Sequence, residues 1–456
     1  MGHPMFEYDA DFTQAVFDYC RERLSMQPVP LDFGSLSPVP MANLDGLISR
    51  DGHRPETILR FFKEGLAQAV VSIDAPNFLA FIPNAPTKNS LLFDMVVACS
   101  GLNGTSWLES AGVVEAENQA LSFLADLAGM PFGSGGAFVS GGSMGNLSGL
   151  TVGRDVGRTM HPTINPRDVR FAISDDAHSS IGKALHVLGV DEFVVATDDH
   201  RFTREHLEAA LAKDPHPENV IGVVATAGTT NAGIIDDIEG LGTFARENGL
   251  WFHVDGAYGG AALLSPTHRH LFEGIRHADS FVVDPHKWLF APLDCAALLY
   301  RNPTVARKVL AQQASYLDIL HTGDDEHYEW NPSDFAIHLS RRARGLPFWF
   351  SLVTYGTAAY ETAVQAALDL AQFAVELVKA SDHVELIREP SLSVVLFRRP
   401  GWSDERYTEW SHQLLRDQVA FVTPTKWEGE TIARFAFLHP DTTHDTIREV
   451  LDSMRD

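Results

Sequence analysis

Lys287 and its neighbour His286 are two basic side chains in the largely apolar segment FVVDPHKWLF (281–290). Burying a charge is costly unless the charge is paired or neutralised. An apolar setting favours the neutral form of a lysine, and a neutral amine attacks an aldehyde to give a Schiff base. The alternative is a lysine that extends along Trp288 to reach solvent. The segment alone favours that alternative.

Two further polar residues follow apolar segments that are typical of strands. Asp255 closes LWFHVD (250–255), and His178 follows VRFAISDDA (169–177). A carboxylate at a strand end is commonly a cap for the next helix, but it can also face a cationic ligand nitrogen. A lone histidine is more often structural, although its flat ring can stack on a planar cofactor. Neither residue indicates chemistry by itself.

A glycine-rich turn, VSGGSMGNLSGL (139–150), lies between a strand-like segment and a helical pattern. Glycines let backbone N–H groups approach an anion, and a helix N-terminus favours negative charge. Ser143 adds a hydroxyl donor. The turn matches neither the dinucleotide fingerprint nor the P-loop, and a plain tight turn is an equally good interpretation.

Together these segments supply the groups that pyridoxal phosphate requires. The glycine-rich turn suits a phosphate, Asp255 suits the pyridine nitrogen, His178 suits a ring face and Lys287 suits the aldehyde. The combination therefore predicts a pyridoxal-phosphate enzyme, and no metal site is expected.

The elements that must position these groups form an α/β pattern. Short apolar strands alternate with helical stretches over 76–345, which predicts a mostly parallel sheet with ligands at its strand ends. Residues 1–75 are predicted as a helical segment that is too small to bury its own apolar face. Residues 346–456 are predicted as a small α+β domain that begins with one long helical stretch over 347–380.

Composition excludes several classes of function. The formal net charge of -25 argues against nucleic-acid partners and against anionic membranes. Three widely spaced cysteines make no disulfide framework, which favours a reducing, cytoplasmic compartment. The N-terminus has no features of a secretory signal, and no apolar run reaches about 18 residues, so no spanning helix is expected.

The ordered motifs SGGSMGN, DDAHSS, TAGTTNAG, HVDGAYGG and DPHKW resemble those of the group II pyridoxal-phosphate-dependent amino acid decarboxylases. That family includes the aromatic-L-amino-acid and glutamate decarboxylases, and the resemblance covers nearly the whole chain. It implies fold type I, with a mostly parallel seven-stranded sheet. It also implies an amino acid substrate and a homodimer with its active sites at the interface.

The resemblance assigns a role to each matching residue. Lys287 carries the cofactor, Asp255 pairs with its ring nitrogen, and Ala257 and His178 cover the two ring faces. Ser143, the backbone of Met144 and Gly145, and His286 hold the phosphate, while Thr230 lies near the ring substituents. The proton donor of the aromatic enzymes is a tyrosine on a mobile loop, and Tyr328 aligns near it when the loop is allowed about two extra residues.

Departures from the aromatic pattern bear on specificity. Phe81, Ile82 and Asn84 stand where the aromatic enzymes typically have Tyr, Phe and Thr, and Thr105 stands where a pocket aromatic is common. Asp284 replaces the Asn of their NPHKW motif. The apolar Phe81 and Ile82 favour an aromatic or other hydrophobic substrate, and Asn84 could contact its carboxylate.

Three alternatives stay open at this level. The chain could decarboxylate an acidic or small amino acid, although the Arg341–Arg342 pair does not discriminate, because aromatic enzymes have related segments. It could be an aldehyde synthase, which combines decarboxylation with oxidative deamination when the loop tyrosine is replaced. It could also bind the cofactor without turnover, against which the complete set of Lys287, Asp255 and His178 argues.

Overall fold

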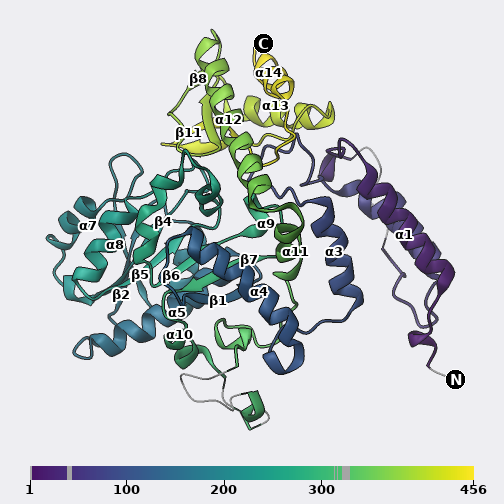
Figure 1. Ribbon diagram of the computed structural model, residues 1–456. Coiled ribbons are helices and arrows are strands. Elements are labelled where there is room, and N and C mark those ends of the chain that lie inside the picture. Colours follow the sequence, from purple (N-terminus) through teal and green to yellow (C-terminus); the bar gives the residue numbers. More distant parts are fainter. Residues whose placement is uncertain (1–2, 38–43, 313, 316, 321–328, 456) are drawn as a thin grey trace.

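The chain folds around one large sheet covered by helices, with a smaller sheet beyond it (Figure 1). The computed structural model describes residues 3–37, 44–312, 314–315, 317–320 and 329–455. In the large sheet β7 runs antiparallel to both of its neighbours and the other pairings are parallel, which confirms the expected mostly parallel seven-stranded sheet. In spatial order its strands are β1 (Gly135–Val139), β7 (Ala296–Tyr300), β6 (Ser280–Val283), β5 (Trp251–Asp255), β4 (Val220–Thr226), β2 (Arg170–Ser174) and β3 (Asp191–Val195).

Alternate residues of these strands enter two hydrophobic clusters, one on each face of the sheet. Phe138 and Phe252 pack in the cluster that includes residues of α4 and α8, whereas Val139 and Trp251 pack with α5 and α6. Burial on both faces explains why the strands are almost continuously apolar. The helices around the sheet are α3 (Lys88–Cys99), α4 (Trp107–Leu127), α5 (Gly142–Met160), α6 (Ser179–Leu188), α7 (Arg204–Leu211), α8 (Ile238–Glu247), α9 (Pro285–Trp288) and α10 (Pro303–Leu310).

Helix α5 lies unusually close to the sheet because glycines recur at every fourth position along the face that it buries. A Cβ added at Gly145 would lie 2.8 Å from Val282, and one at Gly153 would lie 2.5 Å from Trp251. At Gly149 the nearest atom would be Nδ1 of His253, at 3.0 Å. The glycine face therefore brings the backbone of α5 against the side chains of β5 and β6.

The C-terminal part forms a second, antiparallel sheet flanked by helices. The long helix expected over 347–380 is divided at Gly356, whose φ of 74° is easily adopted only by glycine. Helix α12 is the longest, yet neither it nor any other helix of the described residues is long and apolar enough to cross a membrane. The elements are α11 (Leu346–Tyr355), α12 (Thr357–Ala380), β8 (Glu385–Leu386), β9 (Val394–Arg398), α13 (Asp404–Arg416), β10 (Thr425–Trp427), β11 (Glu430–Ala436) and α14 (His444–Asp452).

The N-terminal segment extends away from the rest of the chain (Figure 1). Helix α1 (Ala10–Ser25) begins at Asp9, whose side chain accepts a hydrogen bond from the N–H of Phe12, and it buries none of its residues. Helix α2 (Pro55–Phe61) gives way to a π turn over Phe62–Leu66. These helices leave apolar surface uncovered within one chain.

Candidate active site

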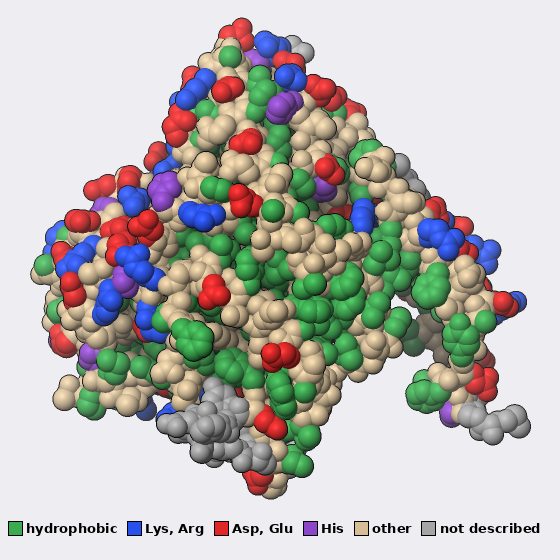
Figure 2. Space-filling model, viewed as in Figure 1, with side chains coloured by type: hydrophobic (Ala, Val, Ile, Leu, Met, Phe, Trp, Pro, Cys, Tyr) green, Lys and Arg blue, Asp and Glu red, His purple; other side chains and the backbone are tan. Residues whose placement is uncertain are grey.

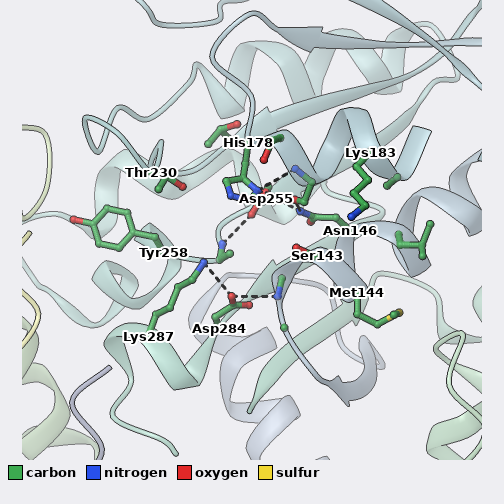
Figure 3. Close-up of a pocket in the computed structure, with 18 of the residues that line it drawn as sticks. Ser143, Met144, Asn146, His178, Lys183, Thr230, Asp255, Tyr258, Asp284 and Lys287 are labelled. Atoms are coloured by element: carbon green, nitrogen blue, oxygen red, sulfur yellow. Dashed lines mark hydrogen bonds and ion pairs between the residues drawn. The ribbon is translucent and has the colours of Figure 1, made fainter. Parts of the chain in front are cut away.

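The carboxyl ends of the parallel strands surround one pocket of about 650 Å³. Strand-end segments at this edge are where ligands bind in open α/β sheets. The pocket brings together most of the residues that the sequence singles out for a cofactor, drawn from turns after β1, β2, β4, β5 and β6 (Figure 3). They are Ser143, Met144, His178, Thr230, Asp255, Ala257, His286 and Lys287.

Lys287 lies in the one-turn helix α9 directly after β6. Its Nζ atom is 3.1 Å from Oδ2 of Asp284, a carboxylate whose side chain is 1% exposed. The segment around Lys287 suggests purely apolar surroundings for its side chain. In the structure the lysine instead faces the buried negative charge of Asp284. Asp284 also accepts a hydrogen bond from the N–H of Gly142, the first residue of α5.

Asp255 ends β5 with its carboxylate buried in the pocket wall. Oδ1 accepts a hydrogen bond from the N–H of Ala257 at 3.1 Å, and Oδ2 accepts one from Nδ2 of Asn146 at 2.8 Å. Asn146 lies one turn inside α5 and is almost fully buried. A carboxylate held by two donors on the protein side and open toward the pocket suits a cationic ring nitrogen.

The N-terminus of α5 forms the end of the pocket that suits an anion. The N–H groups of Met144 and Gly145 donate to the carbonyl of Gly141, so these expected phosphate donors are used inside the helix. Gly145 packs against Val282 and does not line the pocket. Ser143 is exposed, and its N–H has no hydrogen-bond partner among the described residues. Ser143 therefore offers the free donors at this end.

His286 and His178 both line the pocket. Burial lowers the pKa of His286, whose Nδ1 accepts a hydrogen bond from the N–H of Cys295. His178 is the N-cap of α6, and its Nδ1 is 2.7 Å from Oγ of Ser180. The imidazole of His178 stands beside Asp255 in the pocket (Figure 3).

Thr230 borders the pocket after β4 and is fixed by the C-terminal sheet. Its carbonyl oxygen accepts a hydrogen bond of 2.8 Å from Nη2 of Arg434 on β11. Burial lowers the pKa of Arg434 to about 10. The small sheet thus reaches into the wall of the cofactor pocket through one buried arginine.

The substrate-side residues expected from the family pattern do not line this pocket within one chain. The amide of Asn84 donates to the carbonyls of His286 and Ala291, so it supports the lysine turn from behind and is not available for a substrate carboxylate. Thr105 is buried and accepts a hydrogen bond from the N–H of Arg341. Ile82 packs against the core, and the side chain of Phe81 is 60% exposed. Tyr328 lies outside the described residues.

Two functional candidates were not assigned roles from the sequence. Asn146 is inside the glycine-rich motif, but only the packing of α5 on β5 reveals that it meets Asp255. The contact of Asp284 with Lys287 is local, because the two residues are three positions apart and a short helix follows β6. The (i, i+3) spacing on a helix is the signal that could have suggested this pair.

Comparisons with known proteins agree with the geometry. The family model described as the pyridoxal-dependent decarboxylase conserved domain matches residues 40–399. The chain is 31% identical to an aromatic-L-amino-acid decarboxylase of Bacillus atrophaeus, covering 89% of this chain and 85% of the relative. It is 30% identical to a 4-hydroxyphenylacetaldehyde synthase of Rhodiola rosea, covering 76% and 72%. A solved structure of Oryza sativa TDC with PLP and tryptamine has the same fold, with a TM-score of 0.90, 22% identity, and coverage of 100% and 98%.

The match to the family model extends over most of the chain, from residue 40 in the N-terminal segment to residue 399 after β9. It includes every turn that contributes to the pocket, and so the amine, the buried carboxylate and the anion-binding turn all belong to the matched region. The description of this family names pyridoxal, which agrees with the pyridoxal phosphate expected from the residues. This chain therefore belongs to the family of pyridoxal-dependent decarboxylases.

Proposed function

We propose that this enzyme removes the carboxylate of an L-aromatic amino acid to give the corresponding amine and CO₂. The observation that carries the proposal is the convergence of Lys287, Asp255 and Ser143 on one pocket of a pyridoxal-dependent decarboxylase. The 31% identical relative, an aromatic-L-amino-acid decarboxylase, supports the choice of substrate class.

The residues present fit pyridoxal phosphate. The free N–H and the hydroxyl of Ser143 suit its phosphate, with His286 at the same end of the pocket. The carboxylate of Asp255 suits its ring nitrogen, because the two donors that already bind this carboxylate leave it acceptor capacity toward the pocket. Ala257 and His178 would flank the ring, and Thr230 would lie at its edge.

When bound, pyridoxal phosphate supplies an aldehyde that condenses with amines and a conjugated ring that accepts the electron pair left by departing CO₂. Lys287 would hold the cofactor through its amine, at the position that a substrate amine can occupy in its place. Asp255, as a buried anion, would keep a proton on the ring nitrogen. Fixing the substrate so that its carboxylate bond is aligned with the ring system contributes to the rate by orientation.

An aromatic side chain is favoured over an acidic one because the arginines nearest to the predicted substrate segments are already paired. Arg341 makes a fully buried bidentate ion pair with Glu117, at 2.7 and 3.0 Å. Arg342 pairs with Asp94. Neither guanidinium is available to recognise a second carboxylate without breaking an existing pair.

We also propose that the enzyme is a homodimer whose active sites are completed across the interface. Hydrophobic side chains gather on the face around α3 and α11 (Figure 2), and exposed apolar residues there include Leu92, Val96, Val353 and Tyr355. Together with the uncovered α1, this exposed apolar surface is of the kind that marks protein–protein interfaces. In a dimer the exposed Phe81 and the partly buried Ile82 are candidates to face the partner's substrate.

Two further expectations belong to this proposal. A cytoplasmic location is supported by the free cysteines Cys20, Cys99 and Cys295. Division into an N-terminal segment of residues 1–75, a large domain of 76–345 and a small domain of 346–456 is supported by α11, which begins at Leu346.

A second candidate is decarboxylation coupled to oxidative deamination, which consumes O₂ and water and releases CO₂, an aldehyde, ammonia and hydrogen peroxide. Relatives named phenylacetaldehyde synthase and 4-hydroxyphenylacetaldehyde synthase favour this candidate. The presence of Tyr328 favours the amine-forming reaction, because the resemblance gives the tyrosine at this position the task of donating the proton.

The test incubates the cofactor-loaded enzyme with L-tryptophan, L-tyrosine, L-phenylalanine, L-glutamate and L-alanine. CO₂, amine, ammonia and peroxide are measured for each substrate. Equal CO₂ and amine from the aromatic substrates, without O₂ consumption, is the expected result. Equal CO₂, ammonia and peroxide would favour the second candidate, and turnover of L-glutamate alone would overturn the aromatic assignment. Tyr328→Phe should slow amine release or divert the product to aldehyde, and an unchanged product profile would remove Tyr328 from the mechanism.

A further inference from the structure

A single buried amide joins two residues of the cofactor pocket. Nδ2 of Asn146 lies 2.8 Å from Oδ2 of Asp255 and 3.0 Å from Oγ of Ser180. Ser180 in turn contacts Nδ1 of His178 through both its hydroxyl and its N–H, at 2.7 and 3.2 Å. One side chain on α5 is thereby connected to the ring-nitrogen partner and to the residue beside the ring face (Figure 3).

The orientation of this amide is fixed by its neighbours. An ionised carboxylate only accepts hydrogen bonds, so the nitrogen of Asn146 must face Asp255 and its oxygen must face Nε2 of His253, 2.9 Å away. Nε2 of His253 therefore carries a hydrogen. Burial lowers the pKa of His253 to about 4, so the ring is neutral and its Nδ1 is an acceptor.

The chain of donors continues away from the pocket. Oγ of Ser280 is 2.7 Å from Nδ1 of His253 and donates its hydrogen there. The same oxygen accepts the indole N–H of Trp251 at 3.0 Å. Trp251, His253 and Asp255 are alternate residues of β5 and share the face that α5 covers. From Trp251 through Ser280 and His253 to the oxygen of Asn146, each of these hydrogen bonds therefore has a defined direction.

The hydrogen bonds of Ser180 set the tautomer of His178 in the same way. The hydroxyl of Ser180 accepts from Asn146, and its own hydrogen points to Nδ1 of His178. Nδ1 also receives the N–H of Ser180, so Nδ1 is an acceptor and the ring hydrogen lies on Nε2. Nε2 has no partner among the described residues, which leaves this N–H to face the pocket that His178 lines.

We infer that Asn146 is a positioning residue of this active site: its amide, locked by His253, sets the orientation of the Asp255 carboxylate and, through Ser180, the tautomer of His178. The inference rests on the proposed function and deepens it. Asn146 acts through Asp255 and His178 and needs no contact with the substrate. Its removal should therefore lower kcat and cofactor affinity while KM changes little.

The test replaces the amide by an isosteric carboxylate, Asn146→Asp. Two carboxylates would then meet at 2.8 Å, which raises the energy of an ionised Asp255. Titration of the apoenzyme with pyridoxal phosphate should give a dissociation constant weaker by about tenfold or more, with an altered visible absorbance of the bound cofactor. Ser148→Ala is the matched control, because Ser148 is a fully buried residue of α5 whose hydroxyl accepts only the N–H of Ile337 among the described residues. Equal affinity and spectra for Asn146→Asp and this control would overturn the inference.

A second pair of variants covers the case in which Asn146→Asp fails to fold. His253→Gln retains an N–H donor at the place of Nε2, whereas His253→Leu leaves the oxygen of Asn146 without its donor. The inference expects His253→Gln to keep most of the cofactor affinity and His253→Leu to lose about tenfold at similar thermal stability. Equal losses in both would contradict it. Because these readouts use cofactor binding, they remain decisive even if no tested amino acid is decarboxylated.

Discussion

Lys287 and Asp284 form an ion pair of 3.1 Å in which the carboxylate is almost completely buried. Asp284 is also bound by the N–H of Gly142, so the lysine turn after β6 and the glycine-rich turn before α5 are joined through one acid. Its second oxygen, Oδ1, is buried and has no hydrogen-bond partner among the described residues. The negative charge of Asp284 therefore depends strongly on Lys287 for compensation.

Removing the lysine should destabilise the apoenzyme more than removing both partners. Lys287→Ala leaves Asp284 as an uncompensated buried charge and is expected to cost about 2–3 kcal/mol of unfolding free energy. Lys287→Ala combined with Asp284→Asn should recover most of that loss, because the neutral amide still interacts with its surroundings but carries no charge. Urea unfolding of the apo forms measures both values. A double variant no more stable than Lys287→Ala would mean that the pair contributes no charge compensation.

Loss of the Asp255 charge should weaken cofactor retention and turnover together. Asp255→Asn keeps the shape and the buried position but cannot hold a proton on the ring nitrogen, so kcat should fall by at least about a hundredfold. Steady-state kinetics and the cofactor content after dialysis measure the effect. Asp237→Asn is the matched control, since Asp237 caps α8 by accepting the N–H of Gly240. Equal kcat and equal cofactor content for the two variants would mean that Asp255 is only a cap.

The strands of the large sheet, and the polar motifs that follow them, could be predicted from the sequence because each strand is a short apolar run that ends in polar residues. The contact between Asn146 and Asp255 could not, since 109 positions separate the two residues and only the close packing of α5 on β5 unites them. The division of the long C-terminal helix at Gly356 was missed because an isolated glycine is often tolerated within a helix. The contacts of Asn84 could not be predicted either, because its amide nitrogen donates to two backbone carbonyls that no local pattern reveals.

The glycine face of α5 should not tolerate even a methyl group. A Cβ at Gly153 would lie 2.5 Å from the ring of Trp251, and the overpacked interface is expected to cost about 1–3 kcal/mol. A Cβ added at Gly112 on α4 would meet no atom of the described residues within 4 Å, so Gly112→Ala should instead stabilise the protein by up to about 1 kcal/mol through helix propensity. Thermal unfolding of Gly153→Ala and Gly112→Ala compares them. Equal small effects would show that α5 can move away from the sheet without cost.

The link between the large sheet and the hairpin of β10 and β11 should depend on pH through His200. Nδ1 of His200 lies 2.6 Å from Asp176, two residues before His178, and Nε2 lies 3.2 Å from Glu428 in the hairpin. The ring also packs at a tilt of 38° against Trp427, over which Arg388 lies. Burial opposes the charged ring, but the hydrogen bonds to both carboxylates outweigh burial and raise the pKa of His200.

Because the folded-state pKa of His200 is above its unfolded value, roughly 6.5, its stabilising contribution is complete below that pH and is lost as pH rises through the folded-state pKa. His200→Gln should therefore reduce the unfolding free energy at pH about 5.5, by under about 1 kcal/mol, and have little effect at pH about 8.5. His412→Gln, at an exposed position of α13, is the control. Urea unfolding at the two pH values measures the difference, and a His200→Gln effect that is equal at both would contradict a charged link between the two parts of the chain.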